Sequence, residues 1–455
     1  MKYYSTRDSS LQESFTNVLF QGLSKEGGLF LPLYFPKVEI NQLRNKSYEE
    51  VAFNIIKPFI GDEILKDDLY EIINLAYNNF NHSLVAPLIK IDKNKFILEL
   101  FHGPTLAFKD YALQLLGNLL SHFMKINKRK ITIIGATSGD TGSAAIEAFK
   151  GKKNIKIFIL HPNNKISEVQ RRQMTTNVEN NVYNIALNGT FDDCQKIVKG
   201  LFVDRQLQQK TSLTAINSIN WARLMAQIVY YFWAYLQLEE KTVSFIVPSG
   251  NFGNVYSARI AKHMGLPIKD LHIVTNQNDV LHKIISSGEI KKNKVQQTYS
   301  PSMDIQISSN FERQIFESCK NNSDEVNKIM KLLDKNDCYI FDDHIKENFQ
   351  QIYNSQSVTN QKTLETIKTF HSKYNYLADP HTATGLSVLY ENNYEYPLIS
   401  LGCAHPAKFG SAIKKSIDFD IPMPKVLENI FDKKENMHIL NNNSEDIKNF
   451  ILKNI

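Results

Sequence analysis

Residues 131–150 read ITIIGATSGDTGSAAIEAFK, and this stretch decides the fold class. The apolar run at 131–135 predicts a buried strand, and residues 143–150 predict a helix. The turn between them, residues 136–142, holds two glycines, three hydroxyl side chains and one carboxylate. A strand, a short turn and a helix in this order are typical of a βαβ unit in a parallel sheet.

The same alternation continues outward on both sides of this unit. Short apolar runs separated by amphipathic stretches predict an α/β protein with parallel sheets, whose ligands bind where strands turn into helices. The expected strands are residues 156–160, 182–187, 243–247, 271–275 and 397–401, and the expected helices are residues 111–123, 167–175, 191–202, 254–263 and 406–415.

The rest of the chain shows other patterns. Apolar residues at three- and four-residue spacings predict helices at 47–60 and 66–80, and the first ninety or so residues read as helical. The apolar stretch 224–238 is shorter than the roughly 20 residues of a membrane span, which favours a buried helix. Residues 287–375 predict helices and loops over the core, and the Asn-rich tail after Lys425 is expected to pack weakly. We therefore expect a helical N-terminal domain at 1–92, a catalytic core at 93–425 with a smaller lobe at about 110–210, and a tail at 426–455.

Composition excludes several classes of protein. The chain has 455 residues, 42% of them hydrophobic, and a net charge of +6, which is typical of a globular protein and excludes disorder, collagen and coiled coil. Its charges are scattered, so we expect no nucleic-acid partner. The N-terminus lacks an apolar leader, which predicts a cytoplasmic protein without a membrane partner. The four cysteines lack metal-ligand spacing, so we expect a reducing compartment, no disulfide framework and no metal: Cys194, Cys319, Cys338 and Cys403.

Two glycine-rich turns are candidate anion sites. The turn at 136–142, ATSGDTG, precedes a helix, and free backbone N–H groups at a helix N-terminus favour anions. The turn at 248–253, PSGNFG, lies between an expected strand and a helix and has the arrangement of a phosphate cradle. It has neither a Walker A pattern nor GxGxxG, which disfavours a nucleotide-dependent kinase or dehydrogenase. The first turn alone leaves open whether a carboxylate or a phosphate binds.

A third turn, FHGPTLAFKD at 101–110, places Lys109 at the start of a helix. Apolar neighbours and the helix dipole should lower the pKa of this lysine, as an imine-forming lysine requires. The alternative from the residues alone is a surface lysine whose stem lies on apolar neighbours.

Seven motifs, in this order, resemble the threonine synthase family: FHGPTLAFKD, ATSGDTGSAA, GTFDDCQ, NSINWARLMAQ, PSGNFGN, DPHTATG and AHPAKF. Members of this family depend on pyridoxal 5′-phosphate (PLP) and share the tryptophan-synthase-β-like fold, fold type II. The similarity runs from about residue 1 to residue 425. It implies two parallel-sheet α/β lobes around one cofactor, with a mostly helical N-terminal segment.

The resemblance also implies roles for individual residues. Lys109 would carry PLP through an imine, and Asp140 would lie near the ring hydroxyl of the cofactor. The cofactor phosphate would be held by Ser249, Gly250, Asn251, Phe252, Gly253 and Asn254. The candidates for binding substrate are Ser138, Gly139 and Thr141 in the first turn, and Asn217, Ser218, Asn220 and Arg223 in NSINWAR.

Two positions depart from the family pattern. Cys403 stands where relatives usually have a threonine that donates to the pyridine nitrogen, and a thiol is a weaker donor. Relatives tend to have Lys-Gly-Arg where this chain has Asn163, Asn164 and Lys165, so a phosphate-binding role there loses one positive charge.

The implied reaction converts O-phospho-L-homoserine and water to L-threonine and phosphate, with Lys109 moving the protons. The alternatives are a PLP-dependent phospho-lyase or dehydratase that releases 2-oxobutyrate, and a non-catalytic binding protein with the same fold. The expected partner is the small substrate, and the expected state is a monomer or homodimer.

Overall fold

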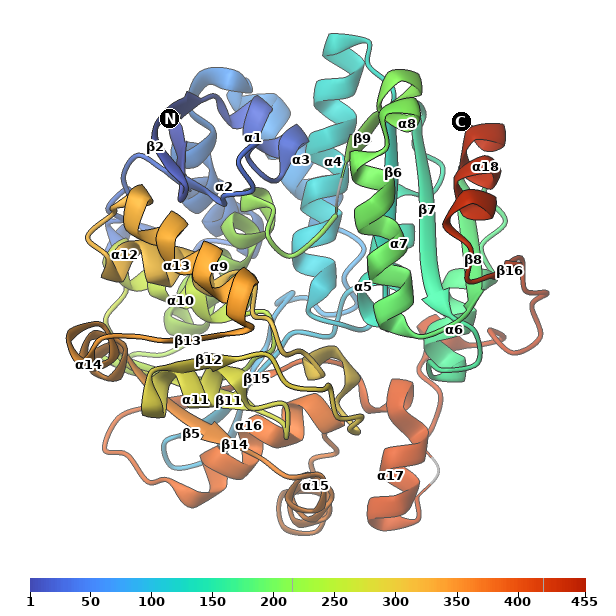
Figure 1. The fold of residues 1–455 in the computed structure, drawn as a ribbon. Helices are drawn as coiled ribbons and strands as arrows, with labels where there is room; N and C mark the ends of the chain where they lie inside the picture. The colour runs from blue at the N-terminus through green and yellow to red at the C-terminus, as the bar shows by residue number, and fades with distance from the viewer. Residues whose placement is uncertain (215, 420) are drawn as a thin grey trace.

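The computed structural model describes residues 1–214, 216–419 and 421–455. Two α/β lobes form most of it, and the N-terminal segment packs beside them (Figure 1). Among the helices in these ranges, none combines the length and apolar character needed to cross a bilayer.

The smaller lobe is built on a five-stranded, fully parallel sheet in the order β16–β8–β7–β6–β9. Its central strands are almost continuously apolar because helices cover both faces. The strands are β6 (Ile131–Ala136), β7 (Ile155–Pro162), β8 (Val182–Asn188), β9 (Ser212–Thr214) and β16 (His438–Asn441), and the helices are α5 (Asp140–Phe149), α6 (Glu168–Thr175), α7 (Phe191–Val203) and α8 (Arg205–Lys210). The predicted strands and helices of this lobe are confirmed.

The larger lobe has a six-stranded sheet in the order β14–β11–β10–β15–β5–β4, parallel except that β4 runs antiparallel to β5. Its strands are β4 (Leu88–Asp92), β5 (Lys95–Glu99), β10 (Val243–Pro248), β11 (Ile268–Thr275), β14 (Tyr353–Ser357) and β15 (Leu398–Gly402). The main helices of this lobe are α9 (Trp221–Leu236), α10 (Gly253–His263), α15 (Asn360–Tyr374), α16 (Pro380–Glu391) and α17 (Gly410–Ile417). Helix α4 (Lys109–Asn127) packs against α5 of the smaller lobe and against α3 (Lys66–Tyr77) and α9. The apolar helix α9 is buried, as predicted, and packs against α4 and α10.

The N-terminal segment contains the two predicted helices, but it begins with a small antiparallel sheet that helical periodicity did not predict. Its helices are α1 (Phe15–Gln21), α2 (Tyr48–Ile60) and α3 (Lys66–Tyr77), and its strands are β1 (Tyr3–Ser5), β2 (Asp8–Glu13) and β3 (Phe30–Pro32). Strands β1 and β3 have three residues each, too few for an alternating pattern, and β2 reads DSSLQE, which is almost entirely polar.

Residues 287–375 hold helices and loops, as predicted, and also an unpredicted edge strand of the larger sheet. That strand, β14, reads YNSQS and pairs in parallel with β11. Its polar composition gives no apolar run to detect. The other elements here and just before are α11 (Val280–Ser287), β12 (Glu289–Lys291), α12 (Phe311–Ser318), α13 (Ser323–Asn336), β13 (Cys338–Ile340) and α14 (Asp343–Ile352).

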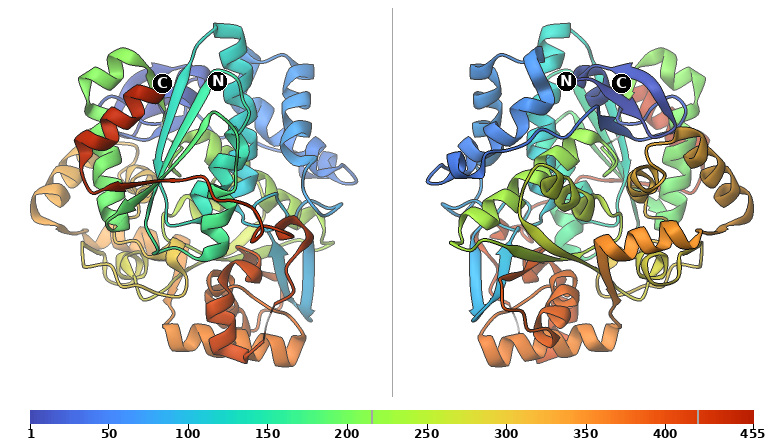
Figure 2. Two further views of the ribbon diagram at one scale, coloured as in Figure 1. Left: turned by 90° about the vertical axis from the view of Figure 1, so that its right-hand side faces the viewer. Right: turned by 90° about the vertical axis from the view of Figure 1, so that its left-hand side faces the viewer.

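The prediction that the C-terminal tail packs weakly is wrong. Strand β16 extends the smaller sheet beside β8, and helix α18 (Ser444–Asn454) lies against the same lobe (Figures 1 and 2). Ile447 and Ile451 are fully buried in the apolar cluster of that lobe. The tail packs because two isoleucines four residues apart share one helix face, a signal hidden by the surrounding asparagines and lysines.

Candidate active site

Lys109 is buried at the first position of α4, in the connection that follows β5. The segment before it is fixed to the turn after β15: the N–H of Phe108 donates to the carbonyl of Cys403 at 2.8 Å, and the N–H of His405 donates to the carbonyl of Leu106 at 3.0 Å. Burial lowers the pKa of Lys109 to about 8, while the nearby carboxylate of Asp140 partly opposes this shift. The environment inferred from the sequence is therefore confirmed, and a surface location is excluded.

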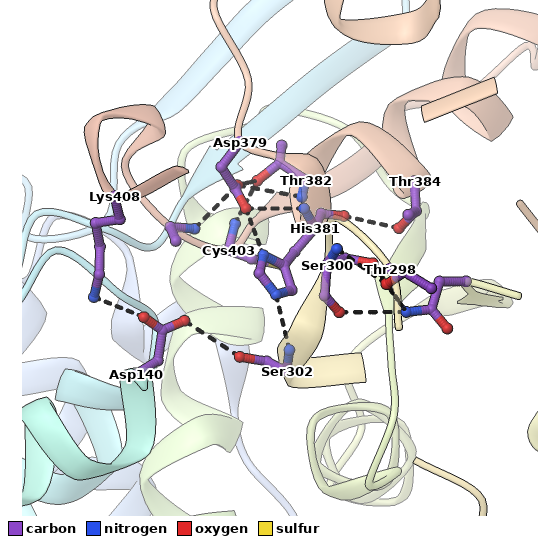
Figure 3. A network of polar contacts seen from close by, with 12 residues as sticks. Asp140, Thr298, Ser300, Ser302, Asp379, His381, Thr382, Thr384, Cys403 and Lys408 are labelled. Atoms are coloured by element: carbon purple, nitrogen blue, oxygen red, sulfur yellow. Dashed lines mark hydrogen bonds and ion pairs between the residues drawn. The ribbon is translucent and has the colours of Figure 1, made fainter. Parts of the chain in front are cut away.

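The carboxylate of Asp140 is buried and belongs to a polar network, and Figure 3 shows its contacts with Lys408 and Ser302. Its Oδ1 accepts from Nζ of Lys408 at 2.7 Å and from Nε2 of Gln170 at 2.8 Å. Its Oδ2 is 3.8 Å from Nζ of Lys109 and accepts from Oγ of Ser302 at 3.4 Å. Burial would raise the pKa of Asp140, but the charges of Lys408 and Lys109 outweigh it and hold that pKa far below its usual range.

Ser302 reaches this network from the short helix η3 (Pro301–Met303), which docks on α16. Its N–H donates to Nε2 of His381 at 3.2 Å, and Nδ1 of His381 lies 2.8 Å from Oδ1 of Asp379. Because Nε2 accepts, the proton of the imidazole is on Nδ1 and points to Asp379. The oxygen of Ser302 then accepts from Nζ of Lys109 at 3.0 Å.

Cys403 is buried directly after β15, and its thiol is near enough to Lys109 to influence the pKa of that lysine. Burial raises the pKa of its thiol well above the usual value, so the group stays protonated. Its N–H donates to Oγ1 of Thr382 at 2.7 Å, and its Sγ contacts the carbonyl of Leu401 at 3.7 Å. The thiol is thus neutral, and in this structure its hydrogen points to the carbonyl of Leu401.

The turn PSGNFG joins β10 to α10, and Phe252 at its end adopts φ 62°. Residues 308–310 occupy its carbonyls: Oγ of Ser308 donates to Gly250, and the N–H of Asn310 donates to Asn251 at 3.2 Å. No side chain caps the N-terminus of α10. Across the described residues, the N–H groups of residues 250–253 have no acceptor, which leaves a row of donors of the kind that binds phosphate.

Asn254, in the first turn of α10, is held by two tyrosines of α9. The hydroxyl of Tyr231 donates to its Oδ1 at 2.7 Å, and the hydroxyl of Tyr230 donates to the same atom. Its Nδ2 is buried and has no partner among the described residues. Asn254 therefore has both N–H donors of its side-chain amide left for a ligand, next to the free backbone N–H groups.

The other predicted turn, between β6 and α5, is fixed from within by Thr137, whose Oγ1 accepts from the N–H groups of Gly139 and Gly142. Gly139 has φ 139°, a conformation that side chains rarely adopt, and a Cβ there would lie 2.4 Å from Gln170. The hydroxyls of Ser138 and Thr141 are partly exposed and have no protein partner within the described ranges. They remain available to a ligand.

The four predicted residues of NSINWAR differ in their surroundings. Asn217 is exposed, and Oγ of Ser218 only just reaches Nδ2 of Asn310 at 3.5 Å. The side chain of Asn220 caps α9 and donates to the carbonyl of Leu19 at 3.0 Å, so its polar atoms are already used.

Arg223 is the strongest anion-binding candidate of this group. It is buried, and its NH1 donates to the carbonyl of Ile216 at 2.9 Å. Its Nε has no partner among the described residues, and burial lowers its pKa to about 10. A buried guanidinium without a carboxylate partner is well suited to a phosphate.

The residues present fit PLP as a cofactor. Lys109 supplies a buried primary amine with a pKa near working pH, and the uncapped turn 250–253 supplies N–H donors for a phosphate. Asp140 supplies a carboxylate beside that amine, and Cys403 supplies a protonated thiol. These parts define a PLP-dependent enzyme with the cofactor between two α/β lobes.

Sequence reasoning missed several members of the network. Lys408 and His381 lie in the motifs AHPAKF and DPHTATG, so a signal was present but no role had been attached to it. Gln170 lies five residues after Lys165, the last of the positions that depart from the family pattern. Ser302 gave no signal, because it lies in a region predicted to cover the core.

Comparisons with known proteins give the same class of enzyme. A family model described as "Pyridoxal-phosphate dependent enzyme" matches residues 85–340, "Threonine synthase N terminus" matches residues 2–77, and "Threonine synthase, C-terminal" matches residues 382–451. A threonine synthase from Pseudomonas aeruginosa is 42% identical, over 99% of this chain and 98% of the relative.

Solved structures give the same result. The chain matches the PLP-bound threonine synthase of Brucella melitensis with a TM-score of 0.96 and 43% identity, over 100% of this chain and 99% of the other. It matches the yeast threonine synthase with a TM-score of 0.94 and 38% identity, over 100% and 98%. The chain therefore belongs to the threonine synthase family of PLP-dependent enzymes.

Proposed function

We propose that this chain converts O-phospho-L-homoserine and water to L-threonine and phosphate, with PLP carried by Lys109. The observation that supports this most directly is the buried amine of Lys109, 3.8 Å from Asp140, in a chain with threonine synthase relatives over its full length. When bound, PLP accepts the negative charge that develops on the substrate carbons.

The residues around the amine have separate tasks in this proposal. Nζ of Lys109 takes the proton from Cα of the substrate and returns protons later in the reaction, which requires a pKa near working pH. Arg223, with its free Nε, binds the phosphate of the substrate at Cγ and stabilises it as it leaves. Ser138 and Thr141 hold the carboxylate with their free hydroxyls. Water then adds at Cβ.

The test is the product formed from O-phospho-L-homoserine by the purified chain loaded with PLP. We expect threonine and phosphate in equal amounts. A predominance of 2-oxobutyrate and ammonia would instead assign the chain to the lyase alternative.

The position of the cofactor is tested separately. Borohydride reduction should fix PLP on the peptide that contains Lys109, and Lys109→Ala should lower turnover by at least about 100-fold. Lys125→Ala is the matched control, because it removes an exposed lysine from the same helix. Unchanged turnover in Lys109→Ala would exclude this catalytic assignment.

A further inference from the structure

Lys408 is a second lysine in the active site, and the reaction as proposed gives it no task. It lies on η4 (Pro406–Phe409), directly after the turn that carries Cys403, and its side chain is fully buried. Its Nζ donates to the carbonyl of Thr105 at 2.8 Å and to Oδ1 of Asp140 at 2.7 Å. A buried ammonium group requires such hydrogen-bond and charge partners, and a change that removes one of them is strongly destabilising.

The two lysines use the carboxylate of Asp140 unequally. Lys408 and Gln170 both donate to Oδ1 at hydrogen-bonding distance, whereas Lys109 lies 3.8 Å from Oδ2 and bonds to Ser302 instead. The carboxylate is therefore satisfied without Lys109. If Lys109 were its only partner, removing a proton from Lys109 would leave a buried, unpaired carboxylate, which is strongly unfavourable.

We propose that Lys408 is a positioning residue that acts as the fixed counter-ion of Asp140 and so leaves the amine of Lys109 free to lose and regain its proton. This inference rests on the proposed function, in which Lys109 carries PLP and moves protons. It adds a residue that acts on Lys109 through Asp140 without touching the substrate.

Other charged groups facing Lys109 do not replace Lys408. Arg223 comes from α9 and is a second repelling cation, and Cys403 is a protonated thiol. Asp110, on the same helix as Lys109, accepts from Thr105 through both oxygens. The carboxylate of Asp379 is occupied by donors from His381, Thr382 and Ala404. Asp140 is thus the carboxylate that Lys109 would pair with if Lys408 were removed.

The direction of the effect follows from these contacts. The charge of Lys408 lowers the pKa of Lys109 by repulsion, and Lys408 also pairs with Asp140, whose carboxylate raises that pKa. Replacing Lys408 by an uncharged residue removes both influences, so Lys109 should hold its proton to higher pH. Replacing Asp140 by Asn removes the negative charge beside Lys109 and leaves the cations Lys408 and Arg223. The pKa of Lys109 should therefore fall.

The experiment measures how fast PLP combines with Lys109 in the full-length chain as pH is varied, followed by visible absorbance after the bound cofactor has been removed and added back. In the wild type, the rate should reach half its maximum near pH 8. In Lys408→Met, the midpoint should rise by about one pH unit, which means about tenfold slower loading at neutral pH. Lys408→Arg keeps the charge and should restore most of the wild-type midpoint.

Asp140→Asn should lower the midpoint pH, whereas Lys408→Met should raise it. A simple loss of packing would not shift the midpoint in opposite directions in the two variants. Lys152→Met is the matched control: this lysine lies beyond the far end of α5, where its Nζ donates to Asn118 at 2.6 Å, and the midpoint should not move. If Lys408→Met folds poorly, Lys408→Gln is a second uncharged variant, and the same rise in its midpoint tests the inference.

An unmoved or lower midpoint in Lys408→Met, or a higher one in Asp140→Asn, would overturn the inference. Reduction with borohydride and peptide mapping of the wild type separates this result from a failure of the proposed function. PLP found on Lys109 together with unmoved midpoints refutes only the role of Lys408, whereas PLP found elsewhere refutes the proposed function.

Discussion

Replacing Ile451 by Ala should destabilise the smaller lobe. Ile451 is fully buried on α18, in the cluster that contains Leu160, Ile185 and Ile197. The change deletes three carbon atoms, worth about 2.4 kcal/mol at about 0.8 kcal/mol per buried methylene. The cavity left behind adds to this, and substitutions of this kind cost about 2–5 kcal/mol in all. We therefore expect the free energy of unfolding to fall by about 3 kcal/mol.

The assay is urea unfolding followed by far-ultraviolet circular dichroism, which reports helices in both lobes. Tryptophan fluorescence is a useful second signal, because both tryptophans, Trp221 and Trp233, lie on α9 and report the core of the larger lobe. Ile439→Ala on β16 is the matched control, since that side chain is 55% exposed and its loss should cost less than about 0.5 kcal/mol. Equal unfolding curves for the two variants would refute the reasoning and show that the tail contributes little.

Two further predictions concern the cofactor. Gly250→Ala would place a Cβ only 3.1 Å from a backbone atom of the segment that covers the turn, so the affinity for PLP should fall by at least about tenfold, as measured by absorbance titration. Gly410→Ala is its control, because a Cβ there meets no atom within 4 Å. Cys403→Thr replaces a weak donor by a hydroxyl and should retain or raise kcat for threonine formation. A fall of more than about tenfold would mean that the packing of the sulfur matters more than its donor strength.

The sequence predicted the fold class and most of the central strands because apolar runs in buried parallel strands are continuous and easy to recognise. It failed where that signal is absent. Strand β14 is polar, strands β1 and β3 have three residues each, and the buried face of α18 consists of two isoleucines in a polar segment. Each of these elements is stabilised by tertiary packing against other parts of the chain, which its own residue pattern does not reveal.

The candidate site shows the same division. Lys109, Asp140 and the turn at 248–253 lie in motifs that resemble those of a known family, so they could be singled out from the sequence alone. The sequence could not show that Lys408, 299 positions after Lys109, shares Asp140 with it, or that Ser302 inserts between that lysine and the carboxylate.

By itself, the sequence determined an α/β chain and singled out a candidate imine-forming lysine and two candidate anion-binding turns, since each of these depends on neighbours within about ten residues. Only the tertiary structure decided which charges meet. The turns after β5, β6 and β15 bring Lys109, Asp140 and Lys408 together. The pKa of Lys109 depends on the charges of the other two residues. The physical reason is that electrostatic energies depend on distance and burial, and both are set by packing between segments far apart in the chain.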